Sequence, residues 1–182
     1  MIKIFAFALT AGIILAQIGH ATENADSVTI GDFEKRVSAW LDFRKKIESN
    51  LPPLKATSSP EKISDHQRKL AGAIRDARPN AKPGDIFTPD IAAEIRRLIS
   101  LAMKPDGKDI AASLQHAEPV HLQLHVNESY PANVPLQSTP PSLLANLPSL
   151  PAEIEYRVVG RDLILLDAKA NLVIDVMENV FS

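Results

Sequence analysis

The stretch that decides the fold is residues 153–177, EIEYRVVGRDLILLDAKANLVIDVM. Apolar and polar side chains alternate here with a period of two, which is typical of a half-buried β-strand. Gly160 and Arg161 form a two-residue turn of the Gly-X kind, which places Val159 opposite Asp162. A second loop, residues 168–171, reverses the chain again. The stretch therefore predicts a three-stranded antiparallel meander.

The register of this meander assigns its side chains to two faces. A slip of one residue would turn the apolar face to water, so the register is well specified. The first face is expected to be fully apolar and to receive the helices; it carries Ile154, Tyr156, Val158, Leu163, Leu165, Leu172, Ile174 and Val176. The second face is mixed but unusually apolar, and either a helix, the Pro-rich segment or a partner is expected to cover it. Its apolar members are Val159, Ile164, Leu166, Val173 and Met177.

Upstream of the sheet, the apolar residues recur with the period of an α-helix. One predicted helix begins near Thr29, ends before the prolines 52–53, and places Trp40 in its apolar stripe. A second begins at Ser59, where a hydroxyl cap precedes a proline. A third begins at Pro89 with the clearest apolar stripe of the chain and is expected to stop at residues 105–107, with a short helix over 109–115.

Between the helices and the meander, the chain is first strand-like and then rich in proline. Val120, Leu122, Leu124 and Val126 alternate with polar residues, which predicts a half-buried strand. Residues 131–151 follow with six prolines and no glycine. Because each proline fixes φ, this segment is expected to be extended and stiff. Its leucines indicate that it wraps over the core.

The N-terminus has the layout of a secretory signal peptide. Lys3 precedes an uncharged apolar run, residues 4–18, and Gly19-His20-Ala21 places small residues at positions −3 and −1. We therefore expect cleavage near Ala21 and export to the periplasm or the extracellular space. A spanning helix needs about 20 apolar residues, so the pattern favours cleavage over a retained anchor, with no membrane span in the mature chain.

These patterns together predict a cleaved signal peptide, residues 1–21, followed by one α+β domain, residues 22–182. The N-terminal helices are followed by an antiparallel sheet that ends in a three-stranded C-terminal meander, and helix 89–103 is expected to lie on the apolar face. Within the domain we assign a helical part (29–117), a Pro-rich wrap (128–151) and the β-meander (153–177).

The composition excludes several classes of function. The chain has no cysteine, which excludes disulfides, thiol catalysis and zinc sites built from thiolates. Without the signal peptide, 19 basic and 22 acidic residues remain, and this near-balance argues against nucleic-acid binding. Residues 22–117 have two more basic than acidic side chains, whereas residues 118–182 have five more acidic than basic ones. Either the two halves attract each other, or an acidic sheet surface meets a basic partner or a cation.

Three histidines lie close together in the sequence: His116, His121 and His125, with acidic residues nearby. Imidazole and carboxylate groups suit zinc, copper or nickel. On a strand, however, His121 and His125 would lie about 13 Å apart, too far for both to bind one ion. Surface histidines are therefore the favoured interpretation. A small periplasmic metal-handling or hydrolytic protein that uses His121, His125 and nearby acids is the alternative function.

No catalytic, cofactor-binding or metal-binding residue is assigned, because the chain contains no nucleophile elbow, phosphate loop or zinc-binding helix motif. The leading hypothesis is a non-enzymatic binding module whose partner is another exported or envelope protein. A structural or assembly subunit that works only with its cognate partner is a third possibility. The Pro-rich segment and the mixed sheet face are the expected contact surfaces, with candidate partner-binding residues Arg157, Val159, Ile164, Leu166, Tyr130 and Leu136.

Overall fold

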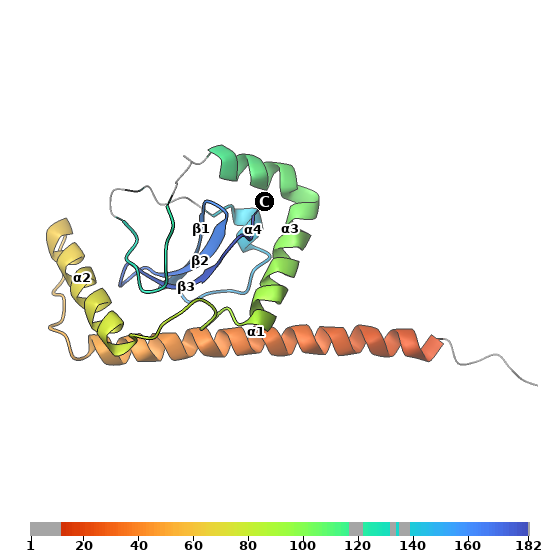
Figure 1. Cartoon of the computed structure of the whole chain (residues 1–182), viewed down its shortest axis with the longest axis horizontal. Helices are drawn as coiled ribbons and strands as arrows, with labels where there is room; N and C mark the ends of the chain where they lie inside the picture. Colours follow the sequence, from red (N-terminus) through yellow and green to blue (C-terminus); the bar gives the residue numbers. More distant parts are fainter. Residues whose placement is uncertain (1–11, 117–121, 132–133, 135–138, 182) are drawn as a thin grey trace, which may run out of the picture.

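The computed structural model describes residues 12–116, 122–131, 134 and 139–181. Helices come first and a sheet comes last, so the predicted α+β class is confirmed (Figure 1). The helices are α1 (Gly12–Glu48), α2 (Pro60–Ala77), α3 (Pro89–His116) and α4 (Pro141–Leu144). The strands are β1 (Ile154–Val159), β2 (Asp162–Asp167) and β3 (Leu172–Met177).

The three strands form the predicted antiparallel meander in the order β1-β2-β3. Val159 pairs with Asp162 and Tyr156 with Leu165, as the two-residue turn requires. Gly160 has a φ of 59°, in the left-handed region that the first residue of such a turn adopts. The local turn chemistry therefore sets the register of the first hairpin.

A β-bulge changes the faces predicted for the second half of β3. The pairing shifts between Leu165 and Leu166, so that Ile174 becomes an extra residue of β3. After the extra residue, each side chain of β3 lies on the face opposite to the one that strict alternation predicts. The prediction that Val176 lies on the first face and Met177 on the second is therefore wrong: each lies in the apolar cluster of the other face.

The bulge also aims Asp175 at the loop between α2 and α3. Asp175 is fully buried, and burial raises the pKa of its carboxyl. Backbone hydrogen bonds oppose that increase, because they favour the ionised form. The donors are the backbone N–H groups of Gly84, Ile86, Phe87 and Val176, at 2.9, 2.6, 2.7 and 2.8 Å. The carboxylate thus fixes this loop to the sheet.

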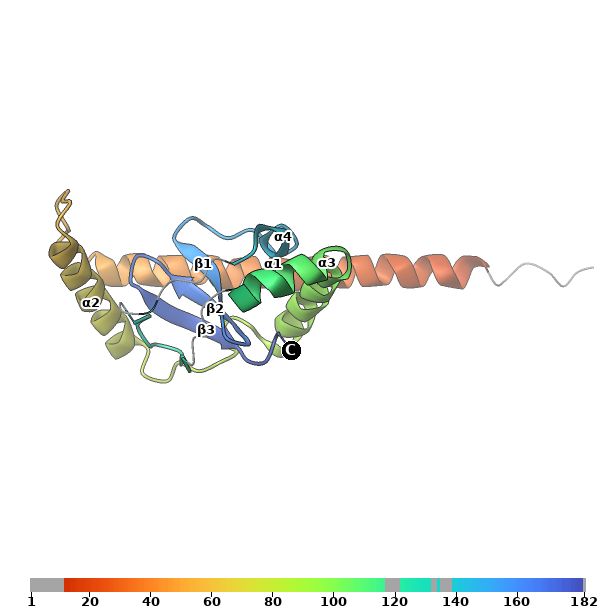
Figure 2. The ribbon, with the colours of Figure 1, turned by 90° about the horizontal axis from the view of Figure 1, so that it is seen from above.

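All four helices contribute to one apolar core on the first face of the sheet (Figures 1 and 2). Phe33 of α1 stacks on Phe87 and on Tyr156 of β1, with ring centroids 6.0 and 6.3 Å apart. Trp40 is buried in the same core, as its place in the helical stripe predicts, and the Arg78 guanidinium lies 5.0 Å from its ring centroid. The helical half is thereby packed directly on the sheet half.

Two helices run further than the sequence predicts. α1 begins at Gly12 instead of near Thr29, so it passes through Ala21, and its N-terminal part extends beyond the rest of the fold (Figures 1 and 2). α3 continues through Pro105 to His116 as one helix with a bend, where a stop and a new helix were predicted (Figure 1). A proline inside a helix removes one hydrogen bond and kinks the helix without necessarily ending it.

The start of α2 agrees with the prediction. Pro60 occupies the first turn, and the Ser59 hydroxyl accepts a hydrogen bond from the backbone N–H of Lys62 at 3.4 Å. Ser59 is therefore the N-cap of α2, as predicted.

Residues 122–131, together with Val134, cover the second face of the sheet. The strand predicted over 120–126 is wrong in its described part, because residues 122–126 form no strand and the chain turns at Asn127, whose φ is 70°. Leu124 is nevertheless buried against the sheet, whereas the His125 side chain is 72% exposed. The alternation of the sequence thus has the expected effect on burial without forming a strand.

Residues 139–151 of the Pro-rich segment pack against the core. Leu143 is fully buried within the main core. The Thr139 hydroxyl donates to the carbonyl of Tyr156 at 2.9 Å, and the Tyr156 hydroxyl donates to the carbonyl of Pro148 at 3.1 Å. The second sheet face and residues 139–151 of the Pro-rich segment therefore make contacts within the chain itself.

Candidate functional site: a groove between α1 and α2

Most of the sequence-predicted partner-binding residues lie inside the protein. Val159, Ile164, Leu166 and Tyr130 come together in the apolar cluster of the second sheet face, and each is at most 4% exposed. Side chains of residues 122–131 and Val134 pack against this cluster. A partner role for these residues stays a prediction, and it would require the covering segment to move aside.

The remaining predicted residues do not gather into one site. Arg157 is partly buried and donates to Glu155 on the same strand. Leu136 lies outside the described residues. The two residues are therefore not brought together with the buried four at an open surface.

The histidine cluster is described only at His125. Its Nδ1 lies 3.3 Å from Oε2 of Glu128 at an exposed position. His121 lies outside the described residues, as does the side chain of His116. Among the residues that the structure describes, no three metal-binding side chains come together.

An open groove lies between the end of α1, the loop 49–59 and the start of α2. We call it the α1–α2 groove; its volume is about 780 Å³, in the range of ligand-binding clefts. Its apolar lining consists of Leu51, Pro53, Leu54 and Ile63. Its polar lining consists of Lys45, Glu48, Ser49, His66, Gln67 and Lys169.

The apolar lining is exposed to a degree that is unusual for this protein. Leu54 and Ile63 are 42% and 38% exposed, and they belong to the few large apolar side chains at the described surface. Ile63 continues the apolar stripe of Leu70 and Ile74, which are fully buried. The start of α2 projects past the sheet edge, so the stripe extends beyond the surface that it covers (Figures 1 and 2).

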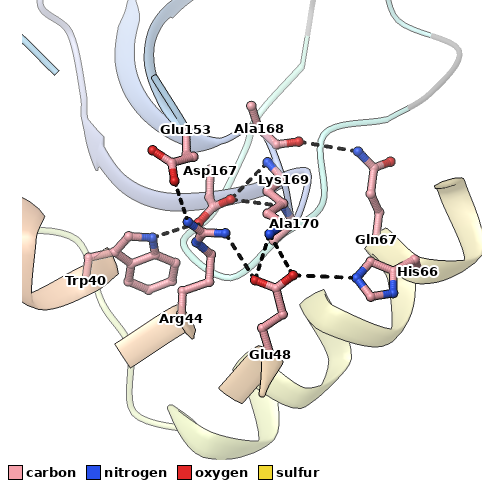
Figure 3. A network of polar contacts seen from close by, with 10 residues as sticks. All are labelled: Trp40, Arg44, Glu48, His66, Gln67, Glu153, Asp167, Ala168, Lys169 and Ala170. Atoms are coloured by element: carbon pink, nitrogen blue, oxygen red, sulfur yellow. Dashed lines mark hydrogen bonds and ion pairs between the residues drawn. The ribbon is translucent and has the colours of Figure 1, made fainter. Parts of the chain in front are cut away.

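A buried ion pair beneath the groove joins α1 to the end of β2 (Figure 3). Nε of Arg44 lies 3.0 Å from Oδ2 of Asp167, and their side chains are 1% and 0% exposed. Trp40 Nε1 donates to the same oxygen at 2.9 Å, and Glu153 lies 3.3 Å from Nη2 of Arg44. Burial raises the pKa of Asp167, although the hydrogen bonds that it accepts and the charge of Arg44 favour the ionised form.

The same carboxylate shapes the turn between β2 and β3. Oδ1 of Asp167 accepts hydrogen bonds from the backbone N–H groups of Lys169 and Ala170, both at 3.0 Å. This is the usual role of an aspartate at a turn. The Gln67 side chain donates to the carbonyl of Ala168 at 3.3 Å, which ties α2 to the turn.

Glu48 links the turn to both helices (Figure 3). Nζ of Lys169 lies 2.7 Å from one of its carboxylate oxygens, and Nε2 of His66 lies 3.9 Å from the same oxygen. Partial burial acts to raise the pKa of Glu48, but the hydrogen bond from Lys169 and the charges of Lys169, Arg44 and His66 outweigh it and hold the pKa below its ordinary value. The walls of the groove are therefore fixed to one another before anything binds.

The sequence reasoning missed this groove. Neither residues 54–58 nor His66 is among the candidate functional residues predicted from the sequence. One signal was available: the apolar stripe of α2 is thin and begins at Ile63, well before its buried members. Which part of that stripe stays uncovered depends on where the sheet ends.

Comparison with known proteins identified no relative: no family model, curated protein or solved structure matches this chain. The described helices include none with the length and apolarity needed to cross a membrane.

Proposed function

We propose that this protein is an exported, non-enzymatic binding module that holds a segment of another exported or envelope protein in the α1–α2 groove. One observation carries the proposal: Leu54 and Ile63, both large, apolar and exposed, line the same concave surface. Exposed apolar side chains that converge in a cleft are typical of a binding site, whereas scattered ones are ordinary. Export is inferred from the N-terminal sequence.

The ion pairs and hydrogen bonds beneath the groove favour ligand binding. Ion pairs and hydrogen bonds connect α1, α2 and the turn 168–170, so the walls need little ordering when a ligand arrives. A preorganised site binds more tightly, because less conformational entropy is lost on association. The apolar cluster of the second sheet face and Leu143 of the Pro-rich segment are buried within the chain, whereas the apolar lining of the groove is exposed, which favours the groove as the binding site.

The test is a capture experiment with matched variants. Purified protein is immobilised and exposed to an envelope extract from the source cells. We expect the double variant Leu54→Asp/Ile63→Asp to lose the species that the wild type captures, since two charges would enter the apolar lining. The matched control is Leu101→Asp/Leu144→Asp, because Leu101 and Leu144 are 40% and 41% exposed but lie outside the groove.

Circular dichroism and a thermal melt establish that both double variants remain folded. Capture that survives in the groove variant, or that is lost equally in the control, would contradict the proposal.

A further inference from the structure

We infer that the segment bound in the α1–α2 groove is an acidic peptide segment that carries a large apolar side chain. This inference rests on the proposed function and specifies the chemistry of the partner. The apolar anchor follows from the lining by Leu51, Leu54 and Ile63. The acidic character follows from the charges that surround this lining.

Residues 45–69, which form two walls of the groove, carry six basic and three acidic side chains. The three acidic side chains each have a neighbour within the chain: Glu48 with Lys169, Glu61 with the Ser59 hydroxyl, and Asp65 with Arg68. The lysines of this stretch, Lys45, Lys46, Lys55, Lys62 and Lys69, are exposed, and Lys45 lines the groove. The segments that border the groove therefore carry a net positive charge, which attracts negative charge.

The ionisable side chains that line the groove also carry a net positive charge. Lys45 and Lys169 carry positive charge, and Glu48 is the single carboxylate among the described lining residues. Glu48 is already in contact with Lys169 and lies 3.5 Å from Nη1 of Arg44. A carboxylate of a partner that approached Lys45 would thus meet an attractive field at this rim.

The main chain of the loop favours a peptide as the occupant. Within the described part of the chain, the amides of Leu54, Lys55 and Ala56 donate to no backbone carbonyl. These groups border the apolar lining, since Leu54 belongs to both. An extended peptide can pair with such groups while an apolar side chain enters the groove, which combines main-chain affinity with side-chain specificity.

The test uses three fluorescein-labelled nonapeptides with leucine at every third position and glutamate, glutamine or lysine elsewhere. Binding to the full chain is measured by fluorescence anisotropy at low and high salt. The glutamate peptide should bind at least about tenfold more tightly than the lysine peptide, and this difference should shrink at high salt, because salt screens exposed charges. Lys45→Glu should weaken binding of the glutamate peptide about fivefold, whereas Lys108→Glu on α3 should leave it unchanged.

The outcomes separate this inference from the proposed function. Equal binding of all three peptides, abolished by Ile63→Asp, would overturn the acidic preference and leave the groove as a binding site. If none of the three peptides binds, or if Ile63→Asp does not affect their binding, both the acidic-peptide inference and the proposed function are overturned. A dimer in sedimentation that Ile63→Asp dissociates would show that a second copy of the chain fills the groove, and it would overturn the acidic-peptide inference.

Discussion

The buried pair of Arg44 and Asp167 gives the sharpest prediction. Replacing Asp167 by Asn keeps the size of the side chain but removes its charge. Arg44, which is 1% exposed, would then lose its closest carboxylate, at present 3.0 Å away. Asparagine also has one acceptor oxygen where aspartate has two. Its NH₂ group would therefore face either the indole N–H of Trp40 or the backbone N–H of Lys169, and the hydrogen bond at that position would be lost.

The magnitude follows from the burial and from the partners that remain. Removing one member of a buried ion pair costs about 3–5 kcal/mol of unfolding free energy. Arg44 keeps Glu153 at 3.3 Å and Glu48 at 3.5 Å, which places the expected loss near the lower limit. With a urea m-value of about 2 kcal/mol per molar, a loss of about 3 kcal/mol lowers the midpoint of unfolding by about 1.5 M.

The assay is urea denaturation followed by the fluorescence of Trp40, with Asp65→Asn as the matched control. Asp65 pairs with Arg68 at the surface, with side chains 54% and 72% exposed, so its replacement should cost less than about 1 kcal/mol. Adding Arg44→Met to Asp167→Asn should recover part of the loss, because the unpaired buried charge disappears. An Asp167→Asn variant as stable as Asp65→Asn would refute the reasoning.

Three further predictions test other parts of the structure. Deleting residues 139–148 should abolish cooperative thermal unfolding, because it removes Leu143 from the core; a deleted protein that melts like the wild type would show that this segment is dispensable. Asp175→Asn should cost about 2–4 kcal/mol in urea denaturation and speed hydrogen exchange at the amides of Ile86 and Phe87, which lose their shared acceptor; unchanged exchange rates would contradict this. The pKa of Glu48 is lowered in the folded state, so its stabilising contribution is present above about pH 4.3, the unfolded value, and is lost as the pH falls through the folded pKa. Glu48→Gln should therefore be less stable than the wild type at pH 7, by less than about 1 kcal/mol, and equally stable at pH 3; a difference that persists at pH 3 would argue against this electrostatic role.

Much of the local structure could be predicted from particular residues. Gly160 and Arg161 set the register of the first hairpin, and Ser59 with Pro60 set the start of α2, because these features depend on neighbours along the chain. The predicted stop of the third helix at residues 105–107, by contrast, is wrong. α3 continues through Pro105 to His116 as one bent helix (Figure 1), because a proline inside a helix does not necessarily end it.

The faces of β3 show a second limit of sequence reasoning. Strict alternation assigned Val176 and Met177 to the wrong faces, because a bulge inserts Ile174 into the strand. The bulge brings Asp175 to the backbone N–H groups of three distant residues, Gly84, Ile86 and Phe87, and no short-range pattern in the sequence reveals these contacts. The candidate site likewise depends on contacts between distant parts of the chain, since its lining comes from α1, a loop, α2 and Lys169.

The sequence by itself determined the α+β class, the meander and the apolar stripes, since turn chemistry and periodicity act over a few residues. The tertiary structure alone decided which apolar surface stays open. Residues 122–131 and Val134 cover the second sheet face, whereas Ile63 at the start of α2 is 38% exposed. Exposure depends on which distant segments come to lie against a surface, and the long-range packing of the whole chain sets those contacts.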